Sequence, residues 1–260
     1  MSWAKWGALG LVLVGCGRIG YDAGTSCDRR PDGMLGVYSF DAVPVDAADE
    51  SGDHDGALLG VATALATTSG PSGCGAAIAF DPAGTGDAAW IEIPDSPDWD
   101  LRRGSVELWV RPPAAGGFAA ILSRDAVGTA LSGHLALFIE PDGTVWARLQ
   151  SPGITAYRCA ELPLTAGAWH HVGINFGPPD FELWIDGADQ TSATPLVSAS
   201  GTDVRCGEAR ANFGIDGNDN PWIVGANGAR APEGTGTPVT DFFVGGAIDE
   251  LRIAPFRRNF

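Results

Sequence analysis

Short apolar runs that alternate with polar residues recur along most of the chain, and clusters of Asp, Gly, Pro and Ser separate them. A period of two is typical of β-strands that bury one face. Turn residues such as Pro141-Asp142-Gly143 and Gly177-Pro178-Pro179-Asp180 indicate hairpins. The pattern predicts an all-β fold with almost no helix and with strands at 36–40, 76–80, 90–93, 105–111, 119–123, 135–140, 144–150, 169–176, 181–185, 222–224 and 247–253.

The first sixteen residues differ from this pattern. Lys5 is followed by the apolar run Trp6 to Val14 and then by Gly15 and Cys16, which is the order of a signal peptide and is too short to span a bilayer. Leu13-Val14-Gly15-Cys16 also resembles the lipobox of bacterial lipoproteins, which implies cleavage after residue 15 and lipidation of Cys16. A buried N-terminal strand with an incidental cysteine is the alternative. With Gly17 after the cysteine, the resemblance implies a lipid anchor in the bacterial cell envelope, at the outer membrane.

The remaining chain divides into a tether and one domain. Residues 16–33 are rich in Gly and Asp, as in a flexible linker, and the predicted strands begin after Met34. Neither an internal repeat nor a stretch suited to a second core follows. We therefore expect a signal peptide at 1–15, a lipid-anchored tether at 16–33 and a single domain at 34–260.

The charge balance narrows the class of partner. The sequence has 16 Lys and Arg against 32 Asp and Glu, with a formal net charge of −16. Such a surface repels phosphate backbones, and the basic residues form no stripe along the sequence. We expect no nucleic-acid partner, and cations or uncharged ligands fit the charge better.

With Cys16 set aside, an even number of cysteines remains in a compartment that permits disulfides. Three pairings are possible, and the nearest-in-chain rule favours Cys27 with Cys74 and Cys159 with Cys206. None of these cysteines has the spacing of a zinc site.

Six segments along the chain form an ordered set of motifs. They are Trp90-Ile-Glu-Ile-Pro-Asp-Ser-Pro, Val106-Glu-Leu-Trp-Val-Arg-Pro, Trp169-His-His-Val, Leu183-Trp-Ile-Asp-Gly, Ile223-Val-Gly-Ala-Asn and Gly246-Ala-Ile-Asp-Glu-Leu-Arg-Ile. In this order they resemble the motifs of the laminin-G-like, concanavalin A-like jelly-roll family. The resemblance covers nearly everything from Met34 to Ile253 and implies a two-sheet antiparallel β-sandwich. It implies no single function, because this fold carries lectins, adhesion modules, carbohydrate-binding modules and hydrolases.

The same resemblance implies a calcium site. The loop from Asp49 to Gly56 resembles an Asp-Ser-Ser-Gly loop of the family, and Asp249 lies in the last strand. Carboxylates and loop carbonyls are the ligands that calcium prefers. The implied ligands are Asp49 and Asp249, with Asp41 as a third, and a solvated acidic turn of the same composition is the alternative.

Tryptophans alternate with aliphatic residues in the predicted strands. Glu107 and Trp109 oppose Val106 and Leu108, and Glu182, Trp184 and Trp146 occupy equivalent outward positions. Flat rings beside charged groups suit a sugar ring, whose C–H face stacks while its hydroxyls form hydrogen bonds. The alternative is a second buried layer, since tryptophan is highly buried on average. The candidate ligand-binding residues are Trp109, Trp146, Trp184, Glu107 and Glu182.

Catalytic motifs are not found in the sequence. His170 and His171 resemble a framework position of the family and are not accompanied by a nucleophile motif. The Glu-x-Asp-x-x-Glu of concanavalin-type hydrolases has only an incomplete counterpart at Glu140-Pro-Asp142. We therefore expect a non-enzymatic, lipid-anchored binding module for a glycan or a cell-surface protein. A structural or adhesive subunit is the first alternative and a polysaccharide hydrolase the second.

Overall fold

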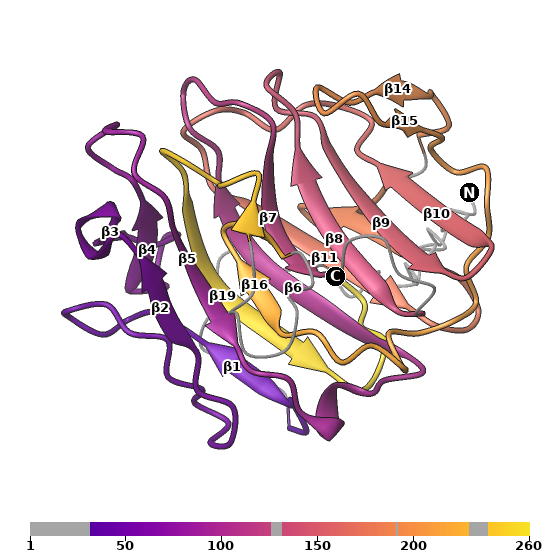
Figure 1. Cartoon of the computed structure of the whole chain (residues 1–260), viewed down its shortest axis with the longest axis horizontal. Coiled ribbons are helices and arrows are strands. Elements are labelled where there is room, and N and C mark those ends of the chain that lie inside the picture. Colours follow the sequence, from indigo (N-terminus) through magenta and orange to yellow (C-terminus); the bar gives the residue numbers. More distant parts are fainter. Residues whose placement is uncertain (1–31, 126–131, 191, 229–238) are drawn as a thin grey trace, which may run out of the picture.

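The computed structural model describes residues 32–125, 132–190, 192–228 and 239–260. Two large antiparallel sheets account for most of its strands (Figure 1). In strand order, the eight-stranded sheet contains β13 (Ala188–Asp189), β12 (Glu182–Ile185), β11 (His170–Phe176), β6 (Gly104–Arg111), β19 (Ala247–Ala254), β4 (Ala76–Phe80) and β3 (Leu65–Ser69), and β1 (Gly36–Tyr38) pairs with β19. The seven-stranded sheet contains β10 (Ile154–Cys159), β9 (Val145–Ser151), β8 (His134–Ile139), β7 (Ala119–Arg124), β16 (Trp222–Val224), β5 (Ala89–Ile93) and β2 (Ala57–Gly60).

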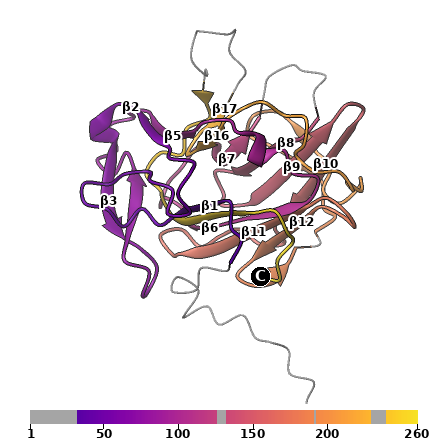
Figure 2. The ribbon, with the colours of Figure 1, turned by 90° about the horizontal axis from the view of Figure 1, so that it is seen from below.

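The two sheets pack face to face, as Figure 2 shows from their edges. Val106, Leu108 and Val110 of β6 point into the core between the sheets, and Val145 and Leu149 of β9 reach it from the other side. Burial of these aliphatic faces supplies the main stabilisation, at about 25 cal/mol per Å² of apolar surface. The predicted two-sheet β-sandwich is therefore confirmed, together with the alternation that led to it.

Several strands were not predicted from the sequence. β2 and β3 are edge strands whose residues are exposed or partly exposed. Their sequences therefore do not show a buried apolar residue at every second position. β10 follows the tight turn at Pro152-Gly153 and is not among the predicted strands. The remaining short pairs are β14 (Leu196–Val197) with β15 (Asp203–Val204) and β17 (Asn227–Gly228) with β18 (Val239–Thr240), and the 3-10 turns are η1 (Ala62–Ala64) and η2 (Pro97–Trp99).

One disulfide holds a long loop to the seven-stranded sheet. Cys159 at the end of β10 bonds to Cys206, as predicted. Isolated bridges from Tyr157 to Cys206 and from Cys159 to Ser192 place the loop along β10. Cys74 is also disulfide-bonded, but Cys27 lies outside the described residues, so that pairing stays a prediction.

The predicted anchor is not among the residues that the structure covers. Cys16, the signal peptide and nearly all of the tether lie outside the described ranges. Within those ranges, no helix has the length and apolar character to cross a bilayer.

Candidate functional site

The outer face of the seven-stranded sheet carries a group of aromatic side chains. Phe138 of β8 and Trp146 of β9 stack with ring centroids 4.3 Å apart, and Phe118 stacks on Phe138 at 5.4 Å. Tyr157 of β10 meets Trp146 edge-on at 5.9 Å. These residues point outward because their strand neighbours face the core. Phe138 and Trp146 are buried, whereas Phe118 and Tyr157 are partly exposed.

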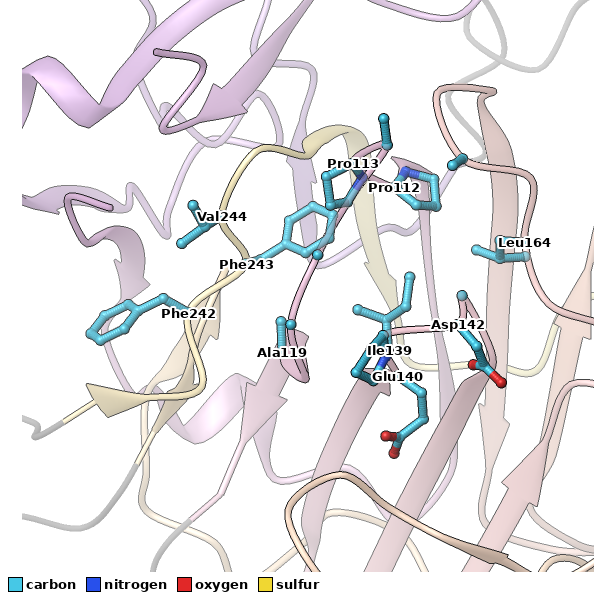
Figure 3. Close-up of a pocket in the computed structure, with 16 residues that line it drawn as sticks. Pro112, Pro113, Ala119, Ile139, Glu140, Asp142, Leu164, Phe242, Phe243 and Val244 are labelled. Atoms are coloured by element: carbon cyan, nitrogen blue, oxygen red, sulfur yellow. The ribbon is translucent and has the colours of Figure 1, made fainter. Parts of the chain in front are cut away.

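A second aromatic pair lies on the same face. Trp90 of β5 and Phe242 are partly exposed, and their ring centroids are 6.0 Å apart. Phe242 and Phe243 point in opposite directions, and Phe243 enters the core (Figure 3). The Asp241 carbonyl accepts a hydrogen bond from the Ala120 N–H of β7, which brings this loop to the sheet. We call Trp90, Phe118, Tyr157 and Phe242, the partly exposed members of the two groups, the aromatic band.

Polar groups lie beside the aromatic band. The Arg148 guanidinium sits 5.6 Å from the centre of the Phe138 ring and forms an ion pair with Asp125. Asp125 is also 3.3 Å from His134. Arg148 and Gln150 of β9 and Glu92 of β5 keep part of their surface exposed. The face thus combines flat apolar rings with charged and amide groups that can form hydrogen bonds.

The disulfide-bonded loop covers one end of this face. Val204 and Cys206 pack against Trp146 and Phe138 in a small cluster separate from the main core. Below the loop, Glu140 Oε1 accepts a hydrogen bond from Trp146 Nε1 at 2.7 Å, and its Oε2 accepts one from the Ala199 N–H at 2.8 Å. Trp146, a predicted ligand-binding residue, is only 1% exposed, so this structure leaves no surface of its ring open to a ligand. The loop that contains Ala199, Val204 and Cys206 covers the ring.

A pocket of about 170 Å³ opens at the end of the sandwich near the aromatic band (Figure 3). Phe243, Ile139 and Leu164 form much of its wall, and Glu140 and Asp142 lie at its border. Both Glu140 oxygens are engaged as described, and Asp142 Oδ1 accepts the Thr144 N–H at 2.8 Å. A pocket of this size holds a small group, because sites for whole small molecules typically measure about 300 to 1,000 Å³.

The other predicted ligand residues lie on the opposite face of the molecule. Glu107 and Trp109 of β6 and Glu182 and Trp184 of β12 point outward from the eight-stranded sheet. Residues 255–260 cross this face, where the Phe260 ring lies 6.3 Å from that of Trp184. Glu107 and Trp109 are buried, and Glu182 and Trp184 are partly exposed. Outward positions on the two sheets point in opposite directions, so Trp109 and Trp184 do not lie on the face that carries Trp146.

The predicted calcium ligands do not form one site. Both oxygens of Asp49 are taken: Oδ1 accepts the N–H groups of Val37 and Ser51 at 2.9 Å each, and Oδ2 accepts that of His54 at 3.2 Å. These hydrogen bonds outweigh burial and lower the pKa of Asp49. Its loop is a turn stabilised by its own carboxylate, which matches the alternative reading of the acidic sequence.

Asp41 and Asp249 lie near each other but not with Asp49. Asp41 Oδ1 accepts the Ala76 N–H at 2.7 Å. Asp249 is fully buried, and burial together with the charges of Glu250 and Asp41 raises its pKa to about 9. Over the described ranges, no group of three or more His, Cys, Asp or Glu side chains is arranged to hold a metal. The donor set therefore does not fit calcium as the family resemblance implied.

The paired histidines are parts of the framework. His170 Nδ1 lies 2.8 Å from Asp186 Oδ2, and its Nε2 accepts the Thr165 N–H at 3.0 Å. His171 is buried on the eight-stranded sheet with Nε2 3.2 Å from Glu107 Oε2. Burial and the charge of Arg252 lower the pKa of His171 to about 4, so the imidazole is neutral at pH 7. Each histidine thus supports its strand.

Sequence reasoning missed most of the aromatic band. Trp90 alternates with Ile91 and Ile93 in the sequence but is not among the predicted ligand-binding residues. Phe118 and Phe242 lie in loops, where no alternation indicates their direction, and Tyr157 lies on the unpredicted strand β10. The adjacent phenylalanines before Gly245-Gly246 were the available signal, since only one of two neighbours in an extended segment can face the core.

Comparisons with known proteins agree with this architecture. The model of the concanavalin A-like lectin/glucanases superfamily matches residues 85–257. A search of curated protein sequences finds no match.

Solved structures include several similar folds. Domain 4 of a GH43 extracellular arabinanase from Geobacillus stearothermophilus, solved with arabinotriose, has a TM-score of 0.52 at 19% identity, over 85% of this chain and 91% of that one. A botulinum neurotoxin type C structure, titled for cell entry dependent on two ganglioside molecules, has a TM-score of 0.50 at 10% identity, over 87% of this chain and 49% of that one. Trypanosoma rangeli sialidase has a TM-score of 0.52 at 13% identity, over 88% of this chain and 32% of that one. These identities show a common fold, and this chain spans about half of the neurotoxin chain and a third of the sialidase.

Proposed function

The chain belongs to the concanavalin A-like lectin/glucanases superfamily, and from this premise we propose that it is a glycan-binding module. The binding surface is the aromatic band on the outer face of the seven-stranded sheet. Arabinotriose and gangliosides, named with two of the similar structures, support a carbohydrate as the class of ligand. The similarity alone does not identify which carbohydrate.

The observation that carries the proposal is the partial exposure of the aromatic band. Trp90, Phe118, Tyr157 and Phe242 are all partly exposed, while Phe138 and Trp146 are buried behind them. A sugar ring stacks its C–H face on such rings, and its hydroxyls need donors and acceptors like those of Arg148 and Gln150 nearby. Trp90 and Tyr157 are fixed on strands, so their rings lose little conformational entropy when a ligand binds.

The proposal includes the position of the module in the cell. The sequence from Lys5 to Cys16 supports export and lipidation of Cys16, with residues 17–33 as the tether. The sandwich would then be held at the bacterial cell envelope, at the outer membrane. Partitioning into Triton X-114 tests this: wild type enters the detergent phase, and Cys16→Ser enters the aqueous phase.

The proposed activity is binding without hydrolysis. A retaining or inverting glycosidase places two carboxyl groups on opposite sides of the scissile bond. In the pocket beside the aromatic band, Glu140 is occupied by Trp146 and Ala199, and it is buried rather than facing Asp142 across an open groove. The alternative of a hydrolase would be supported if the purified protein released reducing sugar from any glycan that it retains.

The direct test is glycan binding by matched variants. Wild type is applied to a glycan array that includes arabino-oligosaccharides and sialylated glycans, and any hit is titrated by calorimetry. Loss of one stacking ring is expected to cost about 1 to 3 kcal/mol, so Trp90→Ala should weaken binding roughly tenfold or more. Retention of no glycan by folded wild type would contradict the proposal and favour an adhesive, protein-binding role.

A further inference from the structure

The outer face of the eight-stranded sheet holds a short segment of the chain in a manner that resembles the binding of a peptide. The segment is residues 255–260, Pro-Phe-Arg-Arg-Asn-Phe, which follows the last strand, β19, and joins no strand of either sheet. Figure 2 shows the C-terminal end of the chain on the outer side of the layer that contains β6, β11 and β12. We call the surface beneath the segment the charged groove, formed by Glu107, His171, Gly173, Asn175, Glu182 and Trp184.

Two carboxylates bind the two arginines of the segment. Arg258 pairs with Glu107, which is 5% exposed, and Arg257 pairs with Glu182. Asn175 Nδ2 is 3.0 Å from Glu182 Oε2 and orients that carboxylate. Charge-assisted hydrogen bonds are stronger than neutral ones. Removal of Arg258 from the buried Glu107 would leave a buried carboxylate with less compensation, which is costly.

The backbone of the segment is also bound. Asn175, which is 2% exposed near the end of β11, donates to the Arg258 carbonyl at 2.9 Å. Its Oδ1 accepts the Arg258 N–H, also at 2.9 Å. One side-chain amide thus forms hydrogen bonds with both the backbone N–H and the backbone carbonyl of a single residue, as in recognition of an extended peptide.

Gly173 provides the space for the aromatic ring of the segment. A Cβ atom at Gly173 would lie 2.5 Å from the Phe260 ring, so the ring would have to move if any other residue stood there. The ring lies between His171, at 5.8 Å, and Trp184, at 6.3 Å. Glycine inside a strand weakens the strand and often marks the close approach of another group. β11 therefore has a slot for a ring in the centre of the sheet face.

From these contacts we propose that the charged groove is a peptide-binding site for segments with two adjacent arginines and an aromatic residue two positions later. Residues 255–260 occupy it in cis, and a segment of the same chemistry in another protein replaces them when they are released. The partner must be basic, since release takes Arg257 from Glu182 and takes Arg258 from Glu107, which keeps Arg252 at 3.4 Å. The short connection to β19 gives the cis segment an effective concentration in the millimolar range, so a free peptide of micromolar affinity competes poorly until release.

The test uses the full chain with the segment released by charge reversal. In Arg257→Glu/Arg258→Glu, both arginine contacts become repulsive, and the groove residues are unchanged. A fluorescein-labelled peptide with the sequence of residues 255–260 should bind this variant at least tenfold more tightly than wild type. The matched control is Arg102→Glu/Arg103→Glu, an equal charge change at exposed positions, which should behave as wild type.

Further changes to Arg257→Glu/Arg258→Glu, the released variant, test whether the peptide binds in the charged groove. Addition of Gly173→Ala should reduce peptide affinity at least tenfold, because the new Cβ atom fills the ring slot. A peptide with glutamates in place of both arginines should bind none of the proteins. If the released variant keeps the far-UV circular dichroism of wild type and binds no peptide, residues 255–260 are structural only and the proposal is wrong.

Hydrogen exchange of wild type covers the case in which the released variant fails to fold. Segment release requires amides 256–260 to exchange through an opening of lower free energy than the amides of β11. If the amides of residues 256–260 and those of β11 both exchange only by global unfolding, the proposal is wrong. Glycan binding is a separate readout, since the aromatic band lies on the other sheet.

Discussion

The two outer faces of the sandwich begin from the same sequence pattern and become different surfaces. On both sheets, aromatic and charged residues occupy the outward positions of strands whose inward positions are aliphatic. The seven-stranded sheet keeps Trp90, Phe118, Tyr157 and Phe242 partly open to solvent. On the eight-stranded sheet, central outward residues such as Glu107 and Trp109 are buried beneath other groups and the segment 255–260.

Coverage by distant segments causes this difference. The loop at 192–207 covers one end of the seven-stranded sheet through the Cys159–Cys206 bond. Residues 255–260 cover the opposite sheet through Arg257, Arg258 and Phe260. A side chain can therefore face outward and still be buried, and a binding site requires side chains that are exposed.

Removal of the ring under the disulfide-bonded loop should have the largest effect on stability. Trp146→Ala empties a space filled by a side chain that is 1% exposed and leaves Glu140 without the indole donor. We expect the free energy of unfolding to fall by about 3 to 5 kcal/mol, measured by urea denaturation. Leu162→Ala, at a side chain that is 76% exposed, should change it by less than about 0.5 kcal/mol. A similar small loss in both variants would mean that the loop does not bury Trp146.

Loss of the disulfide should have the next largest effect. The bond closes a loop with a sequence separation of 47 residues, and Cys159→Ser/Cys206→Ser should reduce stability by about 2 to 4 kcal/mol. The loop should also release Trp146 toward water, with a red shift of tryptophan fluorescence. Val197→Ser on the same loop, at an exposed position, is the control. Unchanged fluorescence in a destabilised double variant would show that the loop packs without the bond.

Much of this architecture was predictable from the sequence, because local alternation determines which side of a strand faces the core. Val106, Leu108 and Val110 entered the core as expected, and the pairing of Cys159 with Cys206 was also predicted. The fate of outward residues was not predictable in this way. The burial of Trp146 depends on Val204 and Cys206. The burial of Glu107 depends on Arg258, which is 151 residues away in the sequence. No local pattern carries such contacts.

The grouping of the predicted calcium ligands could not be judged from the sequence for a related reason. An Asp-rich turn that binds its own N–H groups and one that binds a cation have the same composition, and only the positions of N–H donors distinguish them. Asp49 is surrounded by the N–H groups of Val37, Ser51 and His54.

The pH dependence of stability probes the covered face. The folded chain holds the pKa of His171 at about 4, whereas an unfolded histidine titrates near 6.5. Between these values the unfolded state binds a proton that the folded state does not, so stability falls as the pH drops from about 6.5 to 4, by roughly 1.4 kcal/mol per pH unit. His171→Asn should flatten this part of the profile in urea denaturation at pH 7 and pH 5. Equal slopes for the two proteins would contradict burial of the imidazole.

Calcium should have the smallest effect. Because Asp49 is saturated by N–H groups, we expect the melting temperature to change by less than about 1 °C between excess calcium and excess EDTA. A clear stabilisation by calcium that Asp249→Asn abolishes would restore the metal site at Asp249, without Asp49.

The central claim is that the open aromatic band binds glycan and the covered face does not. Calorimetric titration of a glycan selected on the array into wild type, Trp90→Ala and Trp184→Ala tests it most directly. Both tryptophans are partly exposed outward residues, and they lie on opposite sheets. The account predicts that Trp90→Ala weakens binding at least tenfold while Trp184→Ala leaves the affinity within twofold of wild type. Loss of affinity in Trp184→Ala with full affinity in Trp90→Ala would contradict it.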